Sequence, residues 1–289
     1  MKTILKTMVR GAYDVQKLRI QMGNRVVANF RGKLGIQPST KEEESENPDA
    51  KKVLDVLRKN YVKITDGITK FPRRTSFKGN EVISNYTELC LLKQYVDLED
   101  AEEMHFKLLK NSLKDYPVYT DFLESVKGVG PAMAAVIISE IDIEKAKYAS
   151  SLHKLAGLDV VLPQGEGRSK KKEHLVEVTY IDREGEEKTK MSITFKPFLK
   201  TKLCGVLGPS FLRAGDNKYS QIYNNYKNRL ENSPAHTEKS KGHRHNMSIR
   251  YMVKMFLIDL YAEWRAIEGL EVYPPYHEAK LGLHHKESA

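Results

Sequence analysis

The segment Val126–Ile138 reads VKGVGPAMAAVII and is the most informative stretch of the chain. An apolar-X-Gly-apolar-Gly turn of this kind joins the two short helices of a helix-hairpin-helix motif. Glycines allow the backbone to turn sharply and to approach a phosphate closely, and Pro131 suits the first turn of the second helix. The amides at that helix start can hold a phosphate oxygen without reading base sequence. The alternative is a plain helix-turn-helix corner without a ligand.

Outward from this segment, apolar periodicity predicts a mainly α fold. Apolar residues recur at three- and four-residue steps over 3–31, and further helices are expected at 49–62, 196–207, 217–230 and 246–268. Residues 81–116 are expected to form a long helix or a helical pair, and the glycine turn with a following helix is expected at about 121–157. Alternating apolar residues on both sides of Arg183-Glu184-Gly185 predict one small β-hairpin, with strands His174–Asp182 and Glu186–Phe195. The long helices before residue 118 indicate either an antiparallel coiled arm or simple bundle packing.

We therefore expect two domains. The first is a helical, coiled arm region over residues 1–117, through which the chain could form a homodimer. The second is a helix-hairpin-helix domain over residues 118–289, with the β-hairpin at about 174–195 as an insertion. The acidic tract around Glu42–Asp49 is expected to be a solvated loop, and the tail from Leu270 is expected to lie over the surface.

The charge favours a polyanionic partner. The 289 residues carry a formal net charge of +10, and the basic residues are concentrated in residues 1–35, 196–229 and 239–254. Such segregation is typical of a basic surface that binds nucleic acid. No apolar run is long enough for a signal peptide or a membrane span, so a cytoplasmic protein without a membrane partner is expected.

The region that follows the glycine turn resembles a known family. Three segments are similar to the C-terminal domain of the DEDD-type insertion-sequence transposases of the IS-110/IS-116/IS-902 type: Gly128–Pro131, the Ala-rich helix Ala132–Ile141, and Ser151–Leu158, which is similar to the family's Ser-X-X-X-Leu-Ala-X-X-Ala-Gly-Leu segment. Weaker similarity extends to Leu5–Phe30 and to the helices after residue 196. The resemblance implies DNA binding in transposition or recombination. It also implies work with a structured guide RNA, so RNA is a second candidate partner.

The resemblance also raises the question of catalysis. The family carries a RuvC-like nuclease domain, with four metal-binding acids, ahead of the coiled region at which this chain starts. We expect no cofactor in this chain, and Mg²⁺ only if a partner supplies that domain. By position, Ser169 corresponds to the family's serine nucleophile, and Arg168 and Lys170 would stabilise developing charge. The alternative is that Ser169 is a polar residue of a basic, DNA-contacting loop.

A metal site is not expected elsewhere. Cys90 and Cys204 are isolated, and six of the nine histidines lie after residue 235 without a carboxylate or cysteine spacing that would support a metal site. The segment Lys239–Asn246 is interpreted as a phosphate-contacting loop that leads into a helix. The expected DNA-binding residues are Lys127, Gly128, Val129, Gly130, Ala132, Arg168, Lys170, Lys171, Lys172, Lys200, Lys241, His243, Arg244, Arg250 and Lys254.

The sequence is consistent with three functions. The chain is a nuclease-deficient, DNA-binding derivative of a transposase, a serine-dependent strand-transfer subunit that works with a separate nuclease, or an RNA-binding scaffold protein. Substitution of Gly128 and Gly130 by valine is expected to weaken DNA binding in a protein that still folds.

Overall fold

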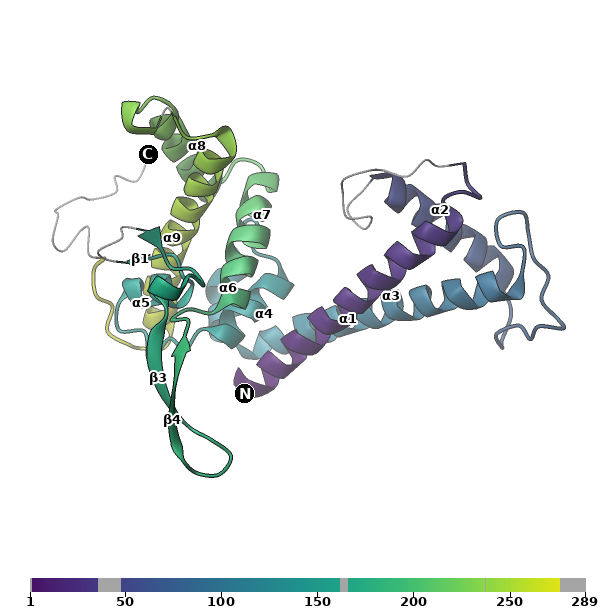
Figure 1. The fold of residues 1–289 in the computed structure, drawn as a ribbon, viewed down its shortest axis with the longest axis horizontal. Helices are drawn as coiled ribbons and strands as arrows, with labels where there is room; N and C mark the ends of the chain where they lie inside the picture. The colour runs from purple at the N-terminus through teal and green to yellow at the C-terminus, as the bar shows by residue number, and fades with distance from the viewer. Residues whose placement is uncertain (1, 36–47, 162–165, 237, 276–289) are drawn as a thin grey trace. The chain divides into compact units, whose positions relative to one another are not determined.

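The computed structural model describes residues 2–35, 48–161, 166–236 and 238–275. The predicted mainly α fold is confirmed, and the strands form two small two-stranded antiparallel sheets (Figure 1). The described chain divides into two compact units. We call residues 7–109 the arm unit, and residues 1–6 with 110–289 the hairpin unit. No described helix combines the length and the apolar character that are needed to cross a bilayer.

The arm unit is built on two long helices that run antiparallel. These are α1 (Lys2–Phe30), which begins in the hairpin unit, and α3 (Tyr86–Ser112). Their direction follows from three contacts at matching positions. Tyr13 packs edge-on against Phe106 with the ring centroids 5.7 Å apart. Arg19 is ion-paired with Glu102, and Lys33, in the turn just after α1, is ion-paired with Glu88 at 2.9 Å. As the residue number rises in α1, it falls in α3.

The third helix of the arm unit, α2 (Pro48–Thr65), packs against this pair and completes an apolar core. Val26, Val53, Leu57 and Leu92 are buried in that core. The arm is thus an antiparallel helix pair with a three-helix core, which includes elements of both packing modes expected from the sequence. The acidic segment 42–47 lies outside the described residues, whereas Asp49 lies in the first turn of α2.

The hairpin unit contains the remaining elements. Its helices are α4 (Pro131–Glu140), α5 (Ala149–Leu155), α6 (Pro197–Thr201), α7 (Gly208–Arg213), α8 (Lys218–Glu231) and α9 (Lys241–Ile267), with a π-helical segment at Lys202–Leu207 between α6 and α7. Short helical turns lie at Leu113–Asp115, Tyr119–Leu123, Lys172–His174 and Pro234–His236. The side chains of Phe211, Met252, Phe256 and Trp264 are among those buried in its core.

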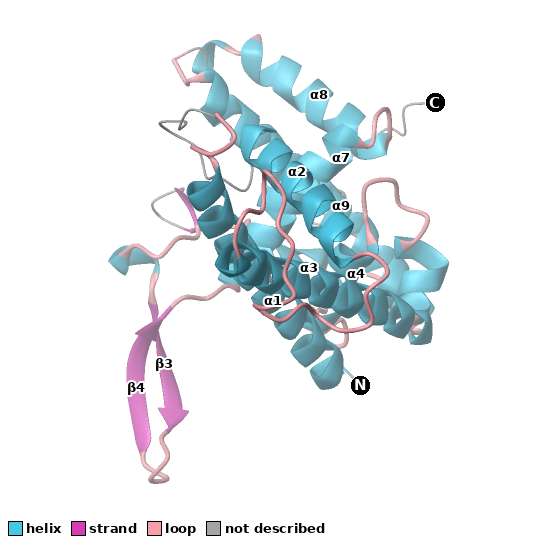
Figure 2. Cartoon of the chain, turned by 90° about the vertical axis from the view of Figure 1, so that its right-hand side faces the viewer, coloured by secondary structure: helices cyan, strands magenta, loops and turns pink. Residues whose placement is uncertain are grey.

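Two antiparallel strand pairs complete this unit. β1 (Val160–Val161) pairs with β2 (Glu166–Gly167), and β3 (Val176–Ile181) pairs with β4 (Glu187–Ser192). The register of the larger pair sets Val176 opposite Ser192 and Ile181 opposite Glu187. Nearly all positions of β3 and β4 are exposed, and the two strands project as a ribbon from the helices (Figure 2).

Several helix and strand boundaries differ from the sequence-based predictions. The last long helix was expected from Asn246 but begins at Lys241, because the Ser240 hydroxyl accepts a hydrogen bond from the His243 amide and caps the helix. The helix expected from residue 81 begins at Tyr86, after Asn85, whose side chain accepts from the Glu88 amide at 2.9 Å. His174, expected to open a strand, lies in a 3₁₀ turn.

Candidate nucleic-acid interface

The glycine turn before α4 has the backbone geometry that the sequence predicted. Gly128 has φ +96°, a left-handed conformation that residues with a Cβ rarely adopt. The Val129 amide donates to the Val126 carbonyl at 3.0 Å, which closes the turn. Gly130 then caps α4 with extended backbone angles, and Pro131 is the first helical residue. The segment before the turn contains only the short π-helical segment Tyr119–Leu123 rather than a regular short helix.

Helix α7 packs against the inner side of this turn. The Ser210 hydroxyl donates a 2.8 Å hydrogen bond to the carbonyl oxygen of Gly128. A Cβ added to Gly128 would lie 2.7 Å from Phe211 Cδ1 and 3.1 Å from Phe211 Cα. A Cβ added to Gly130 would meet nothing within 4 Å. The first glycine is therefore required by packing against α7, whereas the second faces open space.

The outer side of the turn is accessible. Lys127 and Gly130 are exposed, and Ala132 is half-buried. The amides of Met133 and Ala134 both donate to the Gly130 carbonyl at 3.0 Å. Within the described part of the chain, the Ala132 amide makes no hydrogen bond, as expected for an amide in the first turn of a helix. The Val129 side chain is buried and anchors the turn to the core.

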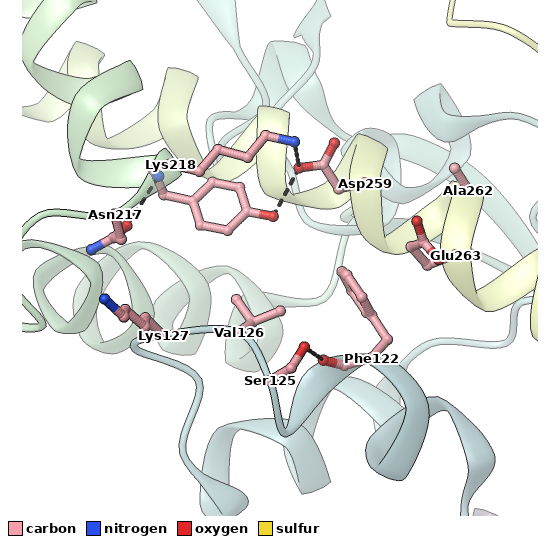
Figure 3. A pocket seen from close by; sticks show the side chains of 10 residues that line it. Phe122, Ser125, Val126, Lys127, Asn217, Lys218, Asp259, Ala262 and Glu263 are labelled. Carbon is pink, nitrogen blue, oxygen red and sulfur yellow. Dashed lines mark hydrogen bonds and ion pairs between the residues drawn. The ribbon is translucent and has the colours of Figure 1, made fainter. Parts of the chain in front are cut away.

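A cavity of about 500 Å³ opens beside the turn (Figure 3). Its lining combines Val126 and Lys127 of the turn with residues at the start of α8 and on α9. The Tyr219 hydroxyl and the Lys218 ammonium both contact Asp259 Oδ2 at 2.8 Å. Burial, and then the neighbouring Asp259 carboxylate, raise the pKa of Tyr219 far above its ordinary value. Tyr219 is therefore a neutral hydrogen-bond donor that fixes α8 to α9.

The loop that carries Ser169 is closely organised around its hydroxyl group. Ser169 Oγ lies 2.7 Å from Nδ1 of His174, and the Lys171 amide donates to the same oxygen at 3.1 Å. The His174 side chain is buried, at 3% exposure, whereas Ser169 is only half-buried. The structure thus places an imidazole directly beside the serine that the family resemblance singled out.

Arg168 anchors this loop rather than facing solvent. Its Nε donates to Asp159 Oδ2 at 2.7 Å, and another guanidinium nitrogen donates to Thr194 Oγ1 at 2.6 Å. Lys200, from α6, donates to the Arg168 carbonyl at 2.8 Å. The guanidinium of Arg168 therefore joins the segment after α5 to the segment before α6, and it anchors the loop that carries Ser169.

Three predicted DNA-binding cations lie in this neighbourhood. Burial lowers the pKa of Lys200, and Arg250 adds to this effect whereas Cys204 and Asp159 oppose it. Burial also lowers the pKa of Lys254, which interacts with Asp159 and Arg250. Arg250 is exposed. Lys200 and Lys254 thus share Asp159 and Arg250 as charged neighbours, and we call Lys200, Arg250 and Lys254 the basic cluster.

Other predicted cations follow Ser169 in the chain or lie in the first turn of α9. Lys170, Lys171 and Lys172 are exposed, and Lys171 is within 3.7 Å of Glu173. Lys241 and His243 are exposed on the first turn of α9. They lie about 14 Å and about 10 Å, respectively, along the helix axis from Arg250.

Arg244, in the same first turn of α9, has a structural contact. Its guanidinium donates to the carbonyls of Lys239 and His236, so it stabilises the loop before α9.

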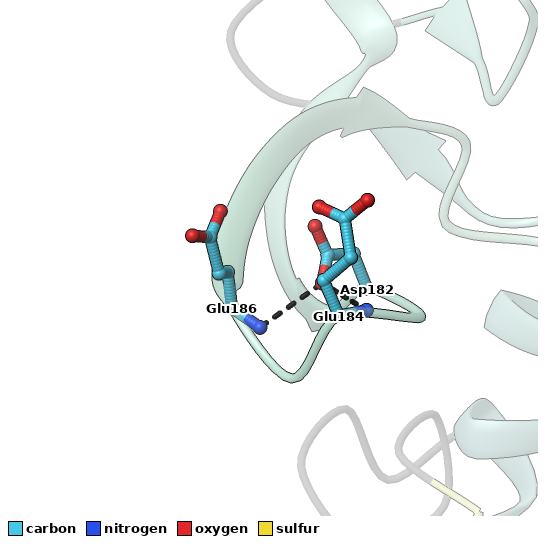
Figure 4. Close-up of side chains that lie close together, drawn as sticks. All are labelled: Asp182, Glu184 and Glu186. Carbon is cyan, nitrogen blue, oxygen red and sulfur yellow. Dashed lines mark hydrogen bonds between the residues drawn. The ribbon is translucent and has the colours of Figure 1, made fainter.

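The structure also contains one acidic cluster among its described residues, at the turn between β3 and β4 (Figure 4). Asp182 Oδ1 accepts the amides of Glu184 and Glu186 at 2.9 and 3.0 Å. Lys188 is ion-paired with all three carboxylates. These carboxylates stabilise a tight turn and a neighbouring lysine, and they do not fit the four-acid magnesium site that the family resemblance implies.

Sequence reasoning missed several residues that build the site. His174 was assigned to a strand, although a histidine five residues after a candidate serine nucleophile was a usable signal. Asp159 and Thr194 carried no motif, because their role depends on contacts made by Arg168. Ser210 is 82 residues from Gly128, and no local pattern predicts that hydrogen bond.

Comparison with known proteins finds a family similarity for the segment that contains the glycine turn and the Ser169 loop. Residues 120–175 match the Transposase IS116/IS110/IS902 family. Neither the curated proteins nor the solved structures contain a match to the chain. The matched segment begins just before the glycine turn and ends where β3 begins, so it includes the turn, α4, α5, Ser169 and His174. The family resemblance predicted from the sequence is confirmed over residues 120–175, which are similar to the C-terminal part of the IS116/IS110/IS902 transposase family.

Proposed function

We propose that this chain binds duplex DNA through its sugar-phosphate backbone, as a protein related to insertion-sequence transposases that acts in transposition or recombination. The observation that carries the proposal is the turn from Val126 to Gly130. Its inner side is fixed by Ser210 and Phe211, whereas its outer side at Gly130 is open. The family match over residues 120–175 independently supports DNA as the partner.

The chemistry of the turn favours a phosphate ligand. The amide of Ala132 points from the first turn of α4, where the helix dipole contributes about half a positive charge. A phosphate oxygen can accept a hydrogen bond from that amide, because Gly130 has no Cβ that would block the approach of the phosphate. Lys127, exposed beside it, adds a full positive charge. Such contacts position a duplex without selecting its sequence.

The basic cluster supplies a second region of contact. Lys200 and Lys254 are partly desolvated, so a phosphate that approaches them interacts more strongly than it would with a fully hydrated ammonium group. The net charge of +10 adds long-range attraction. We infer that the duplex backbone contacts both the glycine turn and the basic cluster.

Binding of a fluorescent duplex, measured by anisotropy across a series of salt concentrations, tests this function. Each neutralised phosphate contributes about −0.9 to the slope of log K against log salt. With contacts at both regions, we expect a slope of about −3 or steeper. A structured RNA competitor is added in parallel. Absence of duplex binding, or preferential binding of the RNA, would contradict the proposal and favour an RNA-binding scaffold.

A second candidate function is strand transfer through Ser169, and the 2.7 Å contact between Ser169 Oγ and His174 favours it. A serine becomes an effective nucleophile when an adjacent base accepts its proton. The expected product is a DNA strand that remains covalently attached to the protein after denaturation. The adduct should disappear in Ser169→Ala and persist in Ser125→Ala, whose hydroxyl only donates to Phe122. An adduct that survives Ser169→Ala would contradict this candidate.

A further inference from the structure

We infer that His174 is the proton acceptor that activates Ser169, and that it is a catalytic residue of the transesterification proposed above. The inference rests on the second candidate function, because it requires Ser169 to attack a phosphodiester. It goes beyond the family match, which assigns no role to a histidine.

The hydrogen bonds around Ser169 define the direction in which its proton can move. A serine hydroxyl has one proton to donate and two lone pairs that accept. The Lys171 amide donates to Ser169 Oγ at 3.1 Å and occupies one lone pair. Nδ1 of His174, at 2.7 Å, is then placed to accept the hydroxyl proton when the neutral imidazole carries its own proton on Nε2. The second lone pair remains for attack on phosphorus.

His174 is held in a fixed position. Its ring is buried at 3% exposure, and the 3₁₀ turn Lys172–His174 is closed by a 2.9 Å bond from the His174 amide to the Lys171 carbonyl. The same short loop thus contains both the nucleophile Ser169 and the proton acceptor His174. A buried base in fixed contact requires little reorganisation when the proton moves.

The charges around the pair suit a phosphodiester. Arg168 is committed to Asp159 and Thr194, so it positions the loop rather than contacting substrate. Lys200 donates to the Arg168 carbonyl, which uses one of the three N–H donors of its ammonium group. Its remaining donors lie next to the backbone of Ser169 and can stabilise the negative charge that develops on the phosphoryl oxygens.

The step is a transesterification without a change of oxidation state. Ser169 Oγ forms a bond to phosphorus as its proton passes to His174 Nδ1. The bond between phosphorus and one deoxyribose oxygen breaks, and that oxygen takes a proton from water and leaves as a hydroxyl group. His174 returns its proton to water. The products are a phosphoserine diester and a free DNA end, so no further reactant is needed.

A fluorophosphonate probe tests the activation without the natural DNA site. The probe forms a Ser Oγ–P bond and releases fluoride, and peptide mass spectrometry locates the adduct. We expect Ser169 to be labelled in the full-length chain and labelling to slow by about 100-fold or more in His174→Gln, the size of a general-base contribution. Added imidazole should restore part of the rate. The matched control is His245→Gln, because His245 Nδ1 also lies 2.7 Å from a hydroxyl group, that of Tyr223.

The outcomes separate this inference from DNA binding, which is measured on the same samples. Equal labelling of Ser169 in the wild type and in folded His174→Gln would overturn the role of His174, although Ser169 would still be a reactive nucleophile. A wild type that binds duplex DNA but is not labelled at Ser169 would overturn the inference while DNA binding stands. Labelling that depends on His174 in a chain without DNA affinity would support the inference and contradict the proposed DNA binding.

A second measurement leaves His174 in place and so does not depend on how His174→Gln folds. In Ser169→Cys, the neighbouring imidazole should stabilise the thiolate and make it react readily at neutral pH. We expect iodoacetamide to alkylate the introduced thiol at least about tenfold faster than the thiol of glutathione. Alkylation at or below the glutathione rate in folded protein would overturn the assignment of His174 as proton acceptor.

Discussion

The hydroxyl of Ser210 donates a 2.8 Å hydrogen bond to the carbonyl oxygen of Gly128, across 82 residues of sequence. This bond ties α7 to the turn before α4. The neighbouring Phe211 ring occupies the space that a side chain at Gly128 would need. The geometry of the proposed phosphate-binding turn therefore depends on α7 as much as on its own glycines.

Replacement of Ser210 by alanine should destabilise the hairpin unit. The carbonyl of Gly128 would lose its partner while remaining half-buried, which costs about 1–2 kcal/mol. Urea unfolding followed by circular dichroism measures this change. Ser125→Ala is the control, because its hydroxyl makes an exposed, local 2.8 Å bond to the Phe122 carbonyl, and it should change stability by less than about 0.5 kcal/mol. Equal effects of the two substitutions would contradict a special role of α7.

The two glycines of the turn should respond differently to alanine. Gly128→Ala combines φ +96° with a contact of 2.7 Å to Phe211, so we expect a loss of about 2–4 kcal/mol. Gly130→Ala meets open space at φ −85° and should be nearly neutral. Thermal unfolding of both variants measures this difference. The structure also contradicts the expectation from the sequence that both positions accept valine in a folded protein, because Phe211 occupies the space that a side chain at Gly128 would need.

DNA affinity should fall in alkaline solution earlier than exposed lysines alone would predict. Burial lowers the pKa of Lys200 and of Lys254. Both are charged below their lowered pKa values, and they lose the charge that attracts phosphate as the pH rises through them. A bound phosphate favours the charged form, so binding should take up protons in that range. Anisotropy titrations from about pH 7 to about pH 10 measure this.

The control for the pH dependence is Lys200→Arg combined with Lys254→Arg. Arginine stays charged throughout this range, so the affinity of the double variant should depend less on pH. Because burial disfavours the charged forms of Lys200 and Lys254, both residues destabilise the folded state below their lowered pKa values. This cost in the free energy of unfolding is relieved as the pH rises through those values. A wild type and a double variant with the same pH profile would exclude the basic cluster from the interface.

Arg168→Ala should disrupt the Ser169 loop even though the substituted side chain is not proposed to contact DNA. Its bonds to Asp159 at 2.7 Å and to Thr194 at 2.6 Å would both be lost. We expect a loss of about 1–2 kcal/mol, reduced from the value for a fully buried charged pair because Arg168 is partly solvated. Lys170→Ala, at an exposed neighbouring position, should stay within about 0.5 kcal/mol. Similar unfolding midpoints for both variants would contradict the anchoring role.

The sequence predicted those parts of the fold that depend on local patterns. The periodic stripe over 3–31 corresponds to α1, and the alternation around Arg183-Glu184-Gly185 corresponds to β3 and β4. The glycine turn was predicted because Gly128 and Gly130 act on their own backbone. The start of α9 at Lys241 was missed, although Ser240 is a favourable capping residue.

The site was predicted less completely, because its contacts join distant segments. Ser169 was found only through the family resemblance, and its imidazole partner was placed in a strand. Arg168 was expected to contact DNA, and its bonds to Asp159 and Thr194 depend on how the segment before β1 and the segment after β4 come together. Lys200 and Lys254 are 54 positions apart in the sequence, and only the fold brings both near Asp159.

The most direct test of the central claim is the affinity of Gly130→Val for duplex DNA, measured by anisotropy at one salt concentration beside the wild type. The valine side chain would occupy the open space at the start of α4 and block the approach of a phosphate to the Ala132 amide. We predict a protein with wild-type circular dichroism whose affinity falls about tenfold, which corresponds to about 1.4 kcal/mol. Unchanged affinity in the folded variant would contradict the proposal that the glycine turn binds the DNA backbone.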